Sequence, residues 1–315
     1  MNQYFLGVDG GQSGTRACIG DETGHVIGVG SAGPCGHAGT PEGRDKFLAV
    51  IHSSLRDACA QAGLDAETMR FTSACLGFSG GPEDKEPILK VTLPSERTLV
   101  TDDAFIALAG ATAGEPGIVV IAGTGSMAFG RNSAGRSARA GGWGYLFGDE
   151  GGAFWIARQA IRAALREEEG WGGATSLGAR LLDSTGARNI NDLMHRCYTP
   201  EFPRPRVARL AVLVNQAAED GVPAALEILE DAARELALLT VAVRGQLFPA
   251  GESTLVTYWG GVFRGHILLA RFRQWLASEA GVGVRAGLYE PSLGALIEAY
   301  RAVGLRLNAI PPTQE

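Results

Sequence analysis

A segment near the middle of the chain repeats the pattern found at its N-terminus. An apolar run at residues 4–9 leads into a turn rich in Gly, Ser and Thr, and the same order returns at residues 118–126. At one constant offset, Gly14-Thr15 matches Gly125-Ser126, and the polar turn at residues 21–24 matches the one at residues 132–135. A repeat of this length restricts the chain to a fold with two similar halves.

Both turns have the composition of a phosphate-binding loop. The first is Asp9-Gly10-Gly11-Gln12-Ser13-Gly14-Thr15, and the second is Gly123-Thr124-Gly125-Ser126. Glycine permits a close approach of the backbone to a ligand, and clustered backbone N–H groups form a nest for an anion. Two such hairpins, one in each half, favour a nucleotide clamped between two similar domains.

Hydrophobic periodicity and turn residues predict the same order of elements twice, three strands followed by helices. In the first half, strands are expected at residues 4–9, 16–20, 25–29, 73–78 and 97–101, and helices at 41–62 and 103–113. In the second half, strands are expected at 118–122, 126–131, 136–140 and 255–258, and helices around 156–165 and at 206–219, 223–245 and 292–303. This order predicts a duplicated α/β domain, with a boundary in the turn at residues 113–117.

Composition excludes several classes of protein. The chain is 45% hydrophobic and 20% charged with a net charge of −6 and no basic stripe, which disfavours disorder and nucleic-acid binding. No apolar run approaches the length of a membrane helix, and no signal peptide is evident, so no membrane partner is expected. The scattered cysteines fit a cytoplasmic, reducing location. The five cysteines are scattered without a CxxC pair, which disfavours disulfides and a zinc or iron–sulfur site.

Two other nucleotide-binding motifs can be compared with the second turn. Residues 123–128 fit G-x-G-x-x-A after a strand, as in dinucleotide-binding folds, but that motif requires a helix to open at once. Here Met127-Ala128-Phe129-Gly130-Arg131 alternates in polarity, which predicts a hairpin instead. A Walker A motif is absent, because none of the three lysines follows Gly ahead of Ser or Thr.

Acidic residues follow two of the predicted strands. Asp9 ends the first strand, where a buried carboxylate is costly unless it faces a cation, so it is a candidate for Mg²⁺ or else a cap for the turn. Asp102 and Asp103 lie between a strand and a helix. Either they cap the helix, or one carboxylate is a general base for a hydroxyl, as phosphoryl transfer to an alcohol requires.

Three further segments are candidate ligand sites. The Gly-rich loop at residues 141–152 carries Trp143, Asp149 and Glu150, which suit a small polyol, although a structural crossover is the alternative. Ser79, next to Gly80, either faces a cleft between the two predicted domains or caps a turn. Gly260 and Gly261 permit close approach of a flat nucleobase, or simply make a tight turn.

Together these segments resemble the sugar kinase/actin/Hsp70 superfamily and, within it, the BadF/BadG/BcrA/BcrD ATPase family, most closely its N-acetylglucosamine kinase-like members. The likeness covers about residues 4–305. It implies duplicated RNase H-like domains with an interdomain cleft. The first would span residues 1–116, completed by a C-terminal helix at about 292–305, and the second residues 117–291 with helical insertions.

The resemblance also implies roles for individual residues. The implied catalytic base is Asp102, and Asp9 would organise Mg²⁺. Implied ATP-binding residues are Gly10, Gly11, Ser13, Thr15, Gly123, Thr124, Gly125, Ser126, Ala232, Gly260 and Gly261. Implied sugar-binding residues are Ser79, Gly80, Asp102, Gly142, Trp143, Gly144, Tyr145 and Asp149. The family places an Asn after the third strand against the sugar; here residues 33–39 hold none, and Cys35 or His37 takes its place.

The function that the resemblance implies is ATP-dependent phosphorylation of a hydroxyl of an amino sugar by a homodimer. Two alternatives remain. One is a sugar or nucleotide sensor without turnover, which has no need of a general base. The other is an activator of 2-hydroxyacyl-CoA dehydratases, which needs cysteine ligands for an iron–sulfur cluster in the second half, where only Cys197 lies.

Overall fold

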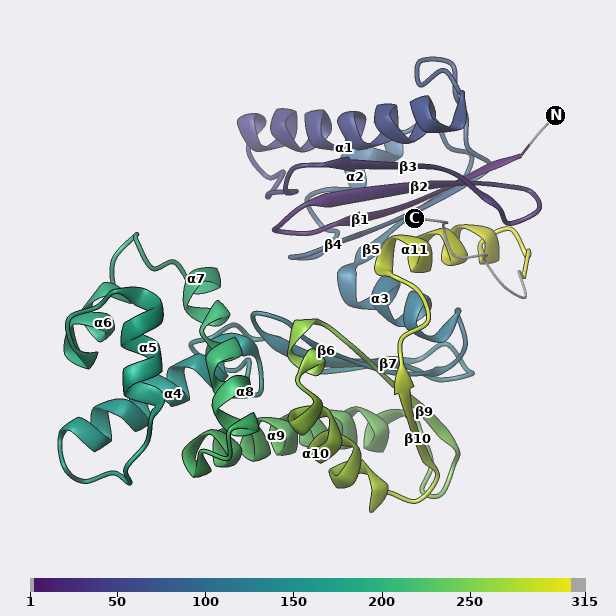
Figure 1. Ribbon diagram of the computed structural model, residues 1–315. Helices are drawn as coiled ribbons and strands as arrows, with labels where there is room; N and C mark the ends of the chain where they lie inside the picture. Colours follow the sequence, from purple (N-terminus) through teal and green to yellow (C-terminus); the bar gives the residue numbers. More distant parts are fainter. Residues whose placement is uncertain (1–2, 307–315) are drawn as a thin grey trace. The chain divides into compact units, whose positions relative to one another are not determined.

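The computed structural model of the protein describes residues 3–306. Its contacts divide the chain into two compact units. The N-terminal unit contains the residues up to Pro116 together with those from Gly287 onward, and the C-terminal unit spans Gly117–Ala286. Each unit contains a five-stranded mixed sheet with helices packed on it (Figure 1). The predicted α/β fold with two similar sheets is confirmed.

The sheet of the N-terminal unit has the order β3-β2-β1-β4-β5. Its strands are β1 (Tyr4–Gly10), β2 (Thr15–Asp21), β3 (Val26–Ala32), β4 (Ser73–Phe78) and β5 (Thr98–Asp102). Its helices are α1 (Pro41–Ala62), α2 (Glu86–Thr92), α3 (Asp103–Thr112) and α11 (Pro291–Arg301). The first three strands form an antiparallel meander, whereas β4 and β5 continue the sheet parallel to β1.

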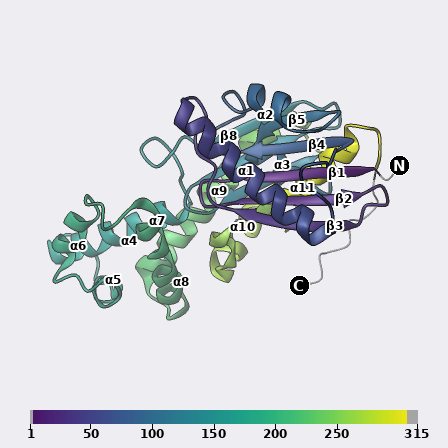
Figure 2. The ribbon, with the colours of Figure 1, turned by 90° about the horizontal axis from the view of Figure 1, so that it is seen from above.

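Helices cover both faces of this sheet. Along β1, Leu6 and Val8 belong to the apolar cluster on the α1 side, whereas Phe5 belongs to the cluster around α11. Figure 2 shows α1 crossing over β1, β2 and β3. Because side chains alternate along a strand, Asp9 has the same parity as Phe5 and lies on the α11 side of the sheet.

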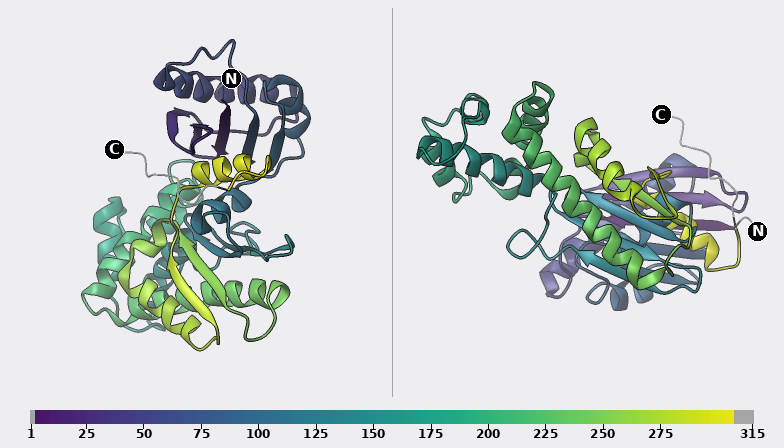
Figure 3. Two further views of the ribbon diagram at one scale, coloured as in Figure 1. Left: turned by 90° about the vertical axis from the view of Figure 1, so that its right-hand side faces the viewer. Right: turned by 90° about the horizontal axis from the view of Figure 1, so that it is seen from below.

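The sheet of the C-terminal unit has the order β10-β9-β6-β7-β8. Its strands are β6 (Gly117–Ala122), β7 (Ser126–Arg131), β8 (Ser137–Gly141), β9 (Thr254–Trp259) and β10 (Val282–Ala286). Its helices are α4 (Ala153–Glu168), α5 (Leu177–Thr185), α6 (Ile190–Arg196), α7 (Arg204–Arg209), α8 (Ala211–Glu219), α9 (Pro223–Leu247) and α10 (His266–Ala277), with the short 3-10 helix η1 (Gly261–Arg264). The long helix α9 lies across the strands (Figure 3).

Most of the predicted strands and helices are confirmed within one or two residues, but the region after β8 differs. The predicted helix at 206–219 is two helices, because the chain turns at Leu210, whose side chain packs in the core. Helices α2, α5, α6 and α10 and strand β10 were not predicted. Within residues 3–306, no helix is long and apolar enough to cross a membrane.

Two helical glycines allow a test of the packing between α3 and α11. A Cβ added at Gly294 would overlap the carbonyl oxygen of Ile106 and the amide of Gly110, whereas one added at Gly245 on α9 meets no atom within 4 Å. Replacing Gly294 by Ala is expected to destabilise the protein by about 1–3 kcal/mol through overpacking. Gly245→Ala should stabilise it by about 0.5–1 kcal/mol, because alanine is the better helix former.

Denaturant unfolding of both variants and the wild type, followed by circular dichroism, measures these effects. Equal stability of the two variants would contradict the close packing of α11 on α3.

Candidate functional site

The carboxyl ends of three parallel strands assemble the candidate site of the N-terminal unit. In register, Gly10 of β1 pairs with Phe78 of β4, and Phe78 pairs with Asp102 of β5. The N–H of Ser79 donates to the carbonyl of Gly10 at 3.1 Å. The structure therefore brings the segments of Asp9, Ser79 and Asp102 to one edge of the sheet, although they are far apart in sequence.

At this edge, both acidic residues of the β5–α3 junction have defined partners. Asp102 is the N-cap of α3, and its Oδ1 accepts a hydrogen bond from the N–H of Phe105 at 2.8 Å. Asp103 Oδ2 accepts from the hydroxyl of Ser79 at 2.6 Å. The capping interpretation of Asp102 is correct, and the cap also fixes its orientation, since a carboxylate has more acceptor sites than one N–H occupies.

Asp9 lies in an acidic environment. Burial, followed by the carboxylates of Asp103 and Glu290, raises the pKa of Asp9 from 3.8 to about 6. Glu290 itself forms an ion pair with Arg16, Nε to Oε1 2.9 Å. A cation beside Asp9 would offset the free-energy cost of burying its carboxylate and the repulsion from the two neighbouring carboxylates. Because residues 3–306 contain no cluster of three or more His, Cys, Asp or Glu suited to a metal, a Mg²⁺ here would rely on Asp9, water and oxygens of the ligand.

The first hairpin is closed by its own backbone. The N–H of Gly11 donates to the carbonyl of Gly14 at 2.9 Å, and the carbonyl of Gly11 accepts from the N–H of Cys35 at 3.0 Å. Ser13 is exposed at the tip. Thr15, by contrast, is 3% exposed and donates its hydroxyl to the carbonyl of Gly33. The hydroxyl of Thr15 thus stabilises the base of the hairpin, and the contact between Thr15 and ATP stays a prediction.

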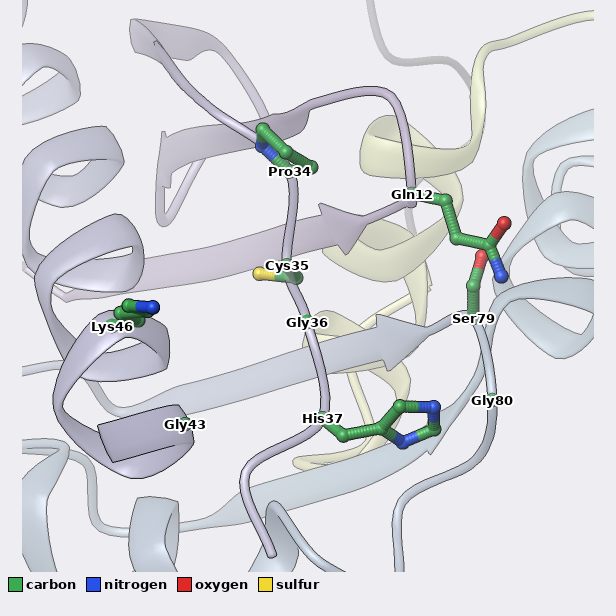
Figure 4. A pocket seen from close by; sticks show the side chains of 9 residues that line it. All are labelled: Gln12, Pro34, Cys35, Gly36, His37, Gly43, Lys46, Ser79 and Gly80. Carbon is green, nitrogen blue, oxygen red and sulfur yellow. The ribbon is translucent and has the colours of Figure 1, made fainter. Parts of the chain in front are cut away.

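A cavity of about 440 Å³ adjoins this edge, and we call it the first pocket. Its lining residues are Gln12, Pro34, Cys35, Gly36, His37, Gly43, Lys46, Ser79 and Gly80. Figure 4 shows the segment that holds Cys35 and His37 between Lys46 on one side and Gln12 and Ser79 on the other. Ser79, Gly80 and His37, which the sequence assigns to the sugar, are therefore neighbours. Gln12 and Lys46 were not predicted.

In the C-terminal unit, the turn between β6 and β7 is held by the start of α4. The carbonyls of Gly123 and Thr124 accept from the N–H groups of Ala153 and Phe154, at 2.8 and 3.1 Å. In a trans peptide the N–H points opposite to the carbonyl, so the N–H groups of Thr124 and Gly125 point away from α4. The anion nest that the sequence predicts at these two groups stays a prediction. The hydroxyl of Ser126 is directed elsewhere, to the carbonyl of Glu150.

Asp149 is packed against this turn. Its side chain is 5% exposed, accepts from the N–H of Ser126 at 3.4 Å and forms an ion pair with Arg204. Its φ of +65° lies in the left-handed region, which is uncommon for residues other than glycine and clusters at functional sites. In this structure Asp149 joins the hairpin to α7, and sequence reasoning missed Arg204 as its partner.

The part of the Gly-rich loop around Trp143 is largely exposed. Trp143 is 66% exposed, with the guanidinium of Arg139 4.7 Å from its ring. Gly142 and Gly144 flank it with positive φ angles, and Tyr145 packs edge-on against Phe154. Trp143 is therefore an exposed ring between two glycines, and its contact with a ligand stays a prediction.

A second cavity, of about 690 Å³, lies beside the hairpin of the C-terminal unit, and we call it the second pocket. Gly123 and Thr124 line it together with Gly261 and residues of α8 such as Asn215. Gly260 is not a lining residue. At φ +111° it packs on the carbonyl of Ala122. Ala232 has no exposed surface, lies in the core and does not line this cavity, so its predicted contact with a nucleotide stays a prediction.

The raised pKa of Asp9 gives a stability prediction for the protein without nucleotide or divalent cation. The folded-state pKa lies above the unfolded value, so ionised Asp9 destabilises the fold, and this cost grows as the pH rises from about 4 to about 6. At pH 7.5, Asp9→Asn should therefore raise the free energy of unfolding by about 1–3 kcal/mol. The gain should vanish near pH 4. Unfolding curves across this pH range measure it, and a gain that does not change with pH would contradict the assignment.

Relatives of known name cover most of the chain. An N-acetylmuramic acid/N-acetylglucosamine kinase of Clostridium acetobutylicum is 33% identical over 87% of this chain and 90% of the relative. An N-acetyl-D-glucosamine kinase of Dictyostelium discoideum is 29% identical over 82% of this chain and 85% of the relative. A glucosamine kinase of Vibrio cholerae is 25% identical over 76% of this chain and 80% of the relative.

Solved structures agree with the fold. A structure described as that of a candidate N-acetylglucosamine kinase from Chromobacterium violaceum has a TM-score of 0.74 and 27% identity, over 94% of this chain and 98% of that one. A ROK family glucokinase from Streptomyces griseus, with 16% identity over 94% of this chain and 98% of that one, shares the fold at a TM-score of 0.54. Residues 6–299 match the model of one family. The chain belongs to the BadF/BadG/BcrA/BcrD ATPase family.

Proposed function

We propose that the protein is an ATP-dependent kinase that phosphorylates a hydroxyl of an amino sugar of the N-acetylglucosamine or glucosamine type. The observation that carries this proposal is the assembly of Asp9, Ser79 and Asp102 at one sheet edge, beside the first pocket. The named relatives support it, because all three are kinases of amino sugars.

In the proposed mechanism, Asp102 accepts the proton of the sugar hydroxyl as that hydroxyl attacks the γ-phosphate. A base must be oriented before it can act in this way. The hydrogen bond from Phe105 N–H and the position at the end of β5 provide that orientation. The hydrogen bond from Ser79 to Asp103 holds the neighbouring carboxylate in place.

We propose that each unit contributes one hairpin to phosphate binding. Gly10, Gly11 and Ser13 supply the first, and the N–H groups of Thr124 and Gly125 supply the second. In the second hairpin, Gly123 lines the second pocket, and the hydroxyl of Ser126 donates to the carbonyl of Glu150. Asp9 would hold Mg²⁺, which neutralises charge on the phosphates when it is bound. The second pocket, which reaches from Thr124 to Gly261, has the size of ligand sites in proteins and would take the adenosine.

Each unit holds residues that we propose as sugar contacts. Ser79, Gly80 and His37 face the first pocket. Gly142, Trp143, Gly144 and Tyr145 belong to the exposed loop, where the ring of Trp143 offers an apolar face. Asp149 stays a predicted sugar ligand, and to serve as one its carboxylate has to share or leave the ion pair with Arg204. The cytoplasmic location and the homodimer also stay predictions.

The direct test is ADP release from Mg·ATP with a panel of N-acetylglucosamine, glucosamine, N-acetylmuramic acid, N-acetylmannosamine and glucose. Turnover that depends on an amino sugar is expected. Sugar binding without turnover would favour the sensor instead. ATP hydrolysis at a rate that does not depend on any sugar would favour an activator-like ATPase.

Replacing the base should abolish most turnover. Asp102→Asn is expected to lower kcat about 10²–10⁴-fold, the usual contribution of a general base. Asparagine caps a helix as well as aspartate does, so the fold should keep its stability. Asp57→Asn, at an exposed position of α1, is the matched control and should keep wild-type turnover. Near-normal activity of the Asp102 variant would refute the role of this residue.

Substitutions at two adjacent glycines beside the second pocket can distinguish an effect on ligand binding from an effect on folding. A Cβ at Gly261 meets no atom within 4 Å, whereas one at Gly260 overlaps the carbonyl of Ala122. Gly261→Val is therefore expected to raise the KM for ATP about tenfold with little change in Tm, since the side chain fills ligand space. Gly260→Ala should instead lower Tm by several degrees, because it combines overlap with a left-handed φ. An unchanged KM in the Gly261 variant would exclude this cavity as the nucleotide site.

A further inference from the structure

The first pocket lies between two segments that the sheet does not join directly. Residues 34–38, after β3, form its first wall, and residues 79–85, after β4, form its second wall (Figure 4). Strands β2 and β1 lie between β3 and β4 in the sheet, so no strand pairing connects the two walls. The distance between them therefore depends on contacts made beyond the ends of the strands.

A buried ion pair bridges the two walls. Lys85 is 1% exposed, and its ammonium group donates to Asp84 Oδ1 at 2.7 Å and to the carbonyl of Gly81 at 3.2 Å. The other oxygen of Asp84, Oδ2, accepts from the N–H of Ala38 in the first wall at 2.7 Å. Among the described residues, this is the one hydrogen bond between the two walls. We call the connection from Gly81 through Lys85 and Asp84 to Ala38 the bridge.

The needs of the neighbouring helix do not explain the bridge. Asp84 precedes α2, but the N-cap of that helix is Lys85, whose side chain makes no capping hydrogen bond. Burial raises the pKa of Asp84, but the hydrogen bonds from Lys85 and from the N–H of Ala38 outweigh burial and hold this pKa below its ordinary value. A buried ion pair adds little net stability compared with well-packed apolar side chains. The arrangement therefore favours a role in holding the geometry of the pocket.

Both ends of the bridge adjoin residues that we propose as sugar contacts. Ala38 follows His37, whose Nδ1 lies 3.8 Å from Asp84 Oδ2. At the other end, Gly81 follows Gly80, and a Cβ added at Gly80 would lie 3.4 Å from Cε1 of His37. The two walls thus approach each other closely at this point, so a small displacement of either wall changes the shape of the pocket.

We propose that Asp84 and Lys85 are positioning residues, which hold the two walls of the first pocket at the separation that the sugar requires before the sugar binds. This inference rests on the proposed kinase function and gives a role to two residues that do not line the pocket. Neither residue touches the sugar or the phosphates in this arrangement. Because walls ordered in advance remove a free-energy cost from binding, the bridge should act on the KM for the sugar and not on kcat.

The combined substitution Asp84→Ala and Lys85→Met, which we call the bridge variant, removes the whole bridge. It leaves no charge unpaired and is therefore expected to fold. The KM for N-acetylglucosamine or glucosamine should rise about tenfold, the effect of one hydrogen bond to a charged group, because the sugar then has to order both walls. The kcat should stay within about twofold of the wild-type value, since the bound geometry is the same. The KM for ATP should not change.

Two single variants serve as comparisons. Lys85→Met keeps the hydrogen bond between Asp84 and Ala38, so the KM for the sugar should rise less than in the bridge variant. Lys90→Met is the matched control, because Lys90 forms an exposed ion pair with Glu86 on α2. It should keep the wild-type KM and kcat.

Hydrogen exchange gives a readout that does not need turnover. Without sugar, peptides that cover residues 34–38 and 79–85 should exchange faster in the bridge variant than in the wild type, because local opening of these segments becomes easier. Peptides from α9 should exchange equally in both proteins. Saturating N-acetylglucosamine should return the two faster peptides of the bridge variant toward wild-type exchange.

The results separate this inference from the proposed function. Equal exchange of the two peptides in the bridge variant and the wild type would refute the inference, whether or not the protein is a kinase. Faster exchange with an unchanged KM for the sugar, or a loss of kcat without a rise in that KM, would refute the positioning role and leave the kinase function in place.

If the wild type phosphorylates no sugar, the proposed function fails, and calorimetric titration with N-acetylglucosamine tests the bridge alone. Weaker binding to the bridge variant than to the wild type would then support the inference. Equal affinities, or no binding to either protein, would refute it.

Discussion

Parallel pairing of β1, β4 and β5 is the constraint on which the N-terminal site depends. Its register aligns Gly10, Phe78 and Asp102, so three short segments from distant parts of the sequence end at the same edge. The packing behind the edge keeps it in place, because α11 lies directly against β1 and α3. A chain segment from the far end of the sequence therefore completes the unit that begins at the N-terminus.

This arrangement concentrates negative charge at a partly buried position. Asp9, Asp103 and Glu290 lie close enough for the last two to raise the pKa of the first. Such a cluster destabilises the protein on its own and becomes favourable when a cation or a positively charged partner arrives. Arg16 offsets Glu290, and Ser79 holds Asp103. Asp9 is the carboxylate whose pKa these neighbours raise, and its role toward a divalent cation stays a proposal.

In the C-terminal unit, the turn between β6 and β7 is held by hydrogen bonds from two directions. The start of α4 takes the carbonyls of the β6–β7 turn, and the loop around Asp149 takes the side chain and N–H of Ser126. These hydrogen bonds fix the position of the turn. The ion pair between Asp149 and Arg204 links this loop to α7, next to the helix that lines the second pocket. Hairpin, loop and pocket are parts of one connected arrangement.

The sequence by itself determined the duplicated α/β fold, most strands and the two hairpins, because period-two apolar runs and Gly-rich turns are local signals. The sequence also indicated Asp9, Ser79 and Asp102 as candidate site residues. Tertiary structure alone decided where side chains point. It turned the hydroxyl of Thr15 inward, buried Ala232, paired Asp149 with Arg204 and brought Lys46 to the first pocket. These side-chain positions depend on contacts between residues that are distant in sequence. Such contacts form only when the whole unit packs, and no local sequence pattern encodes them.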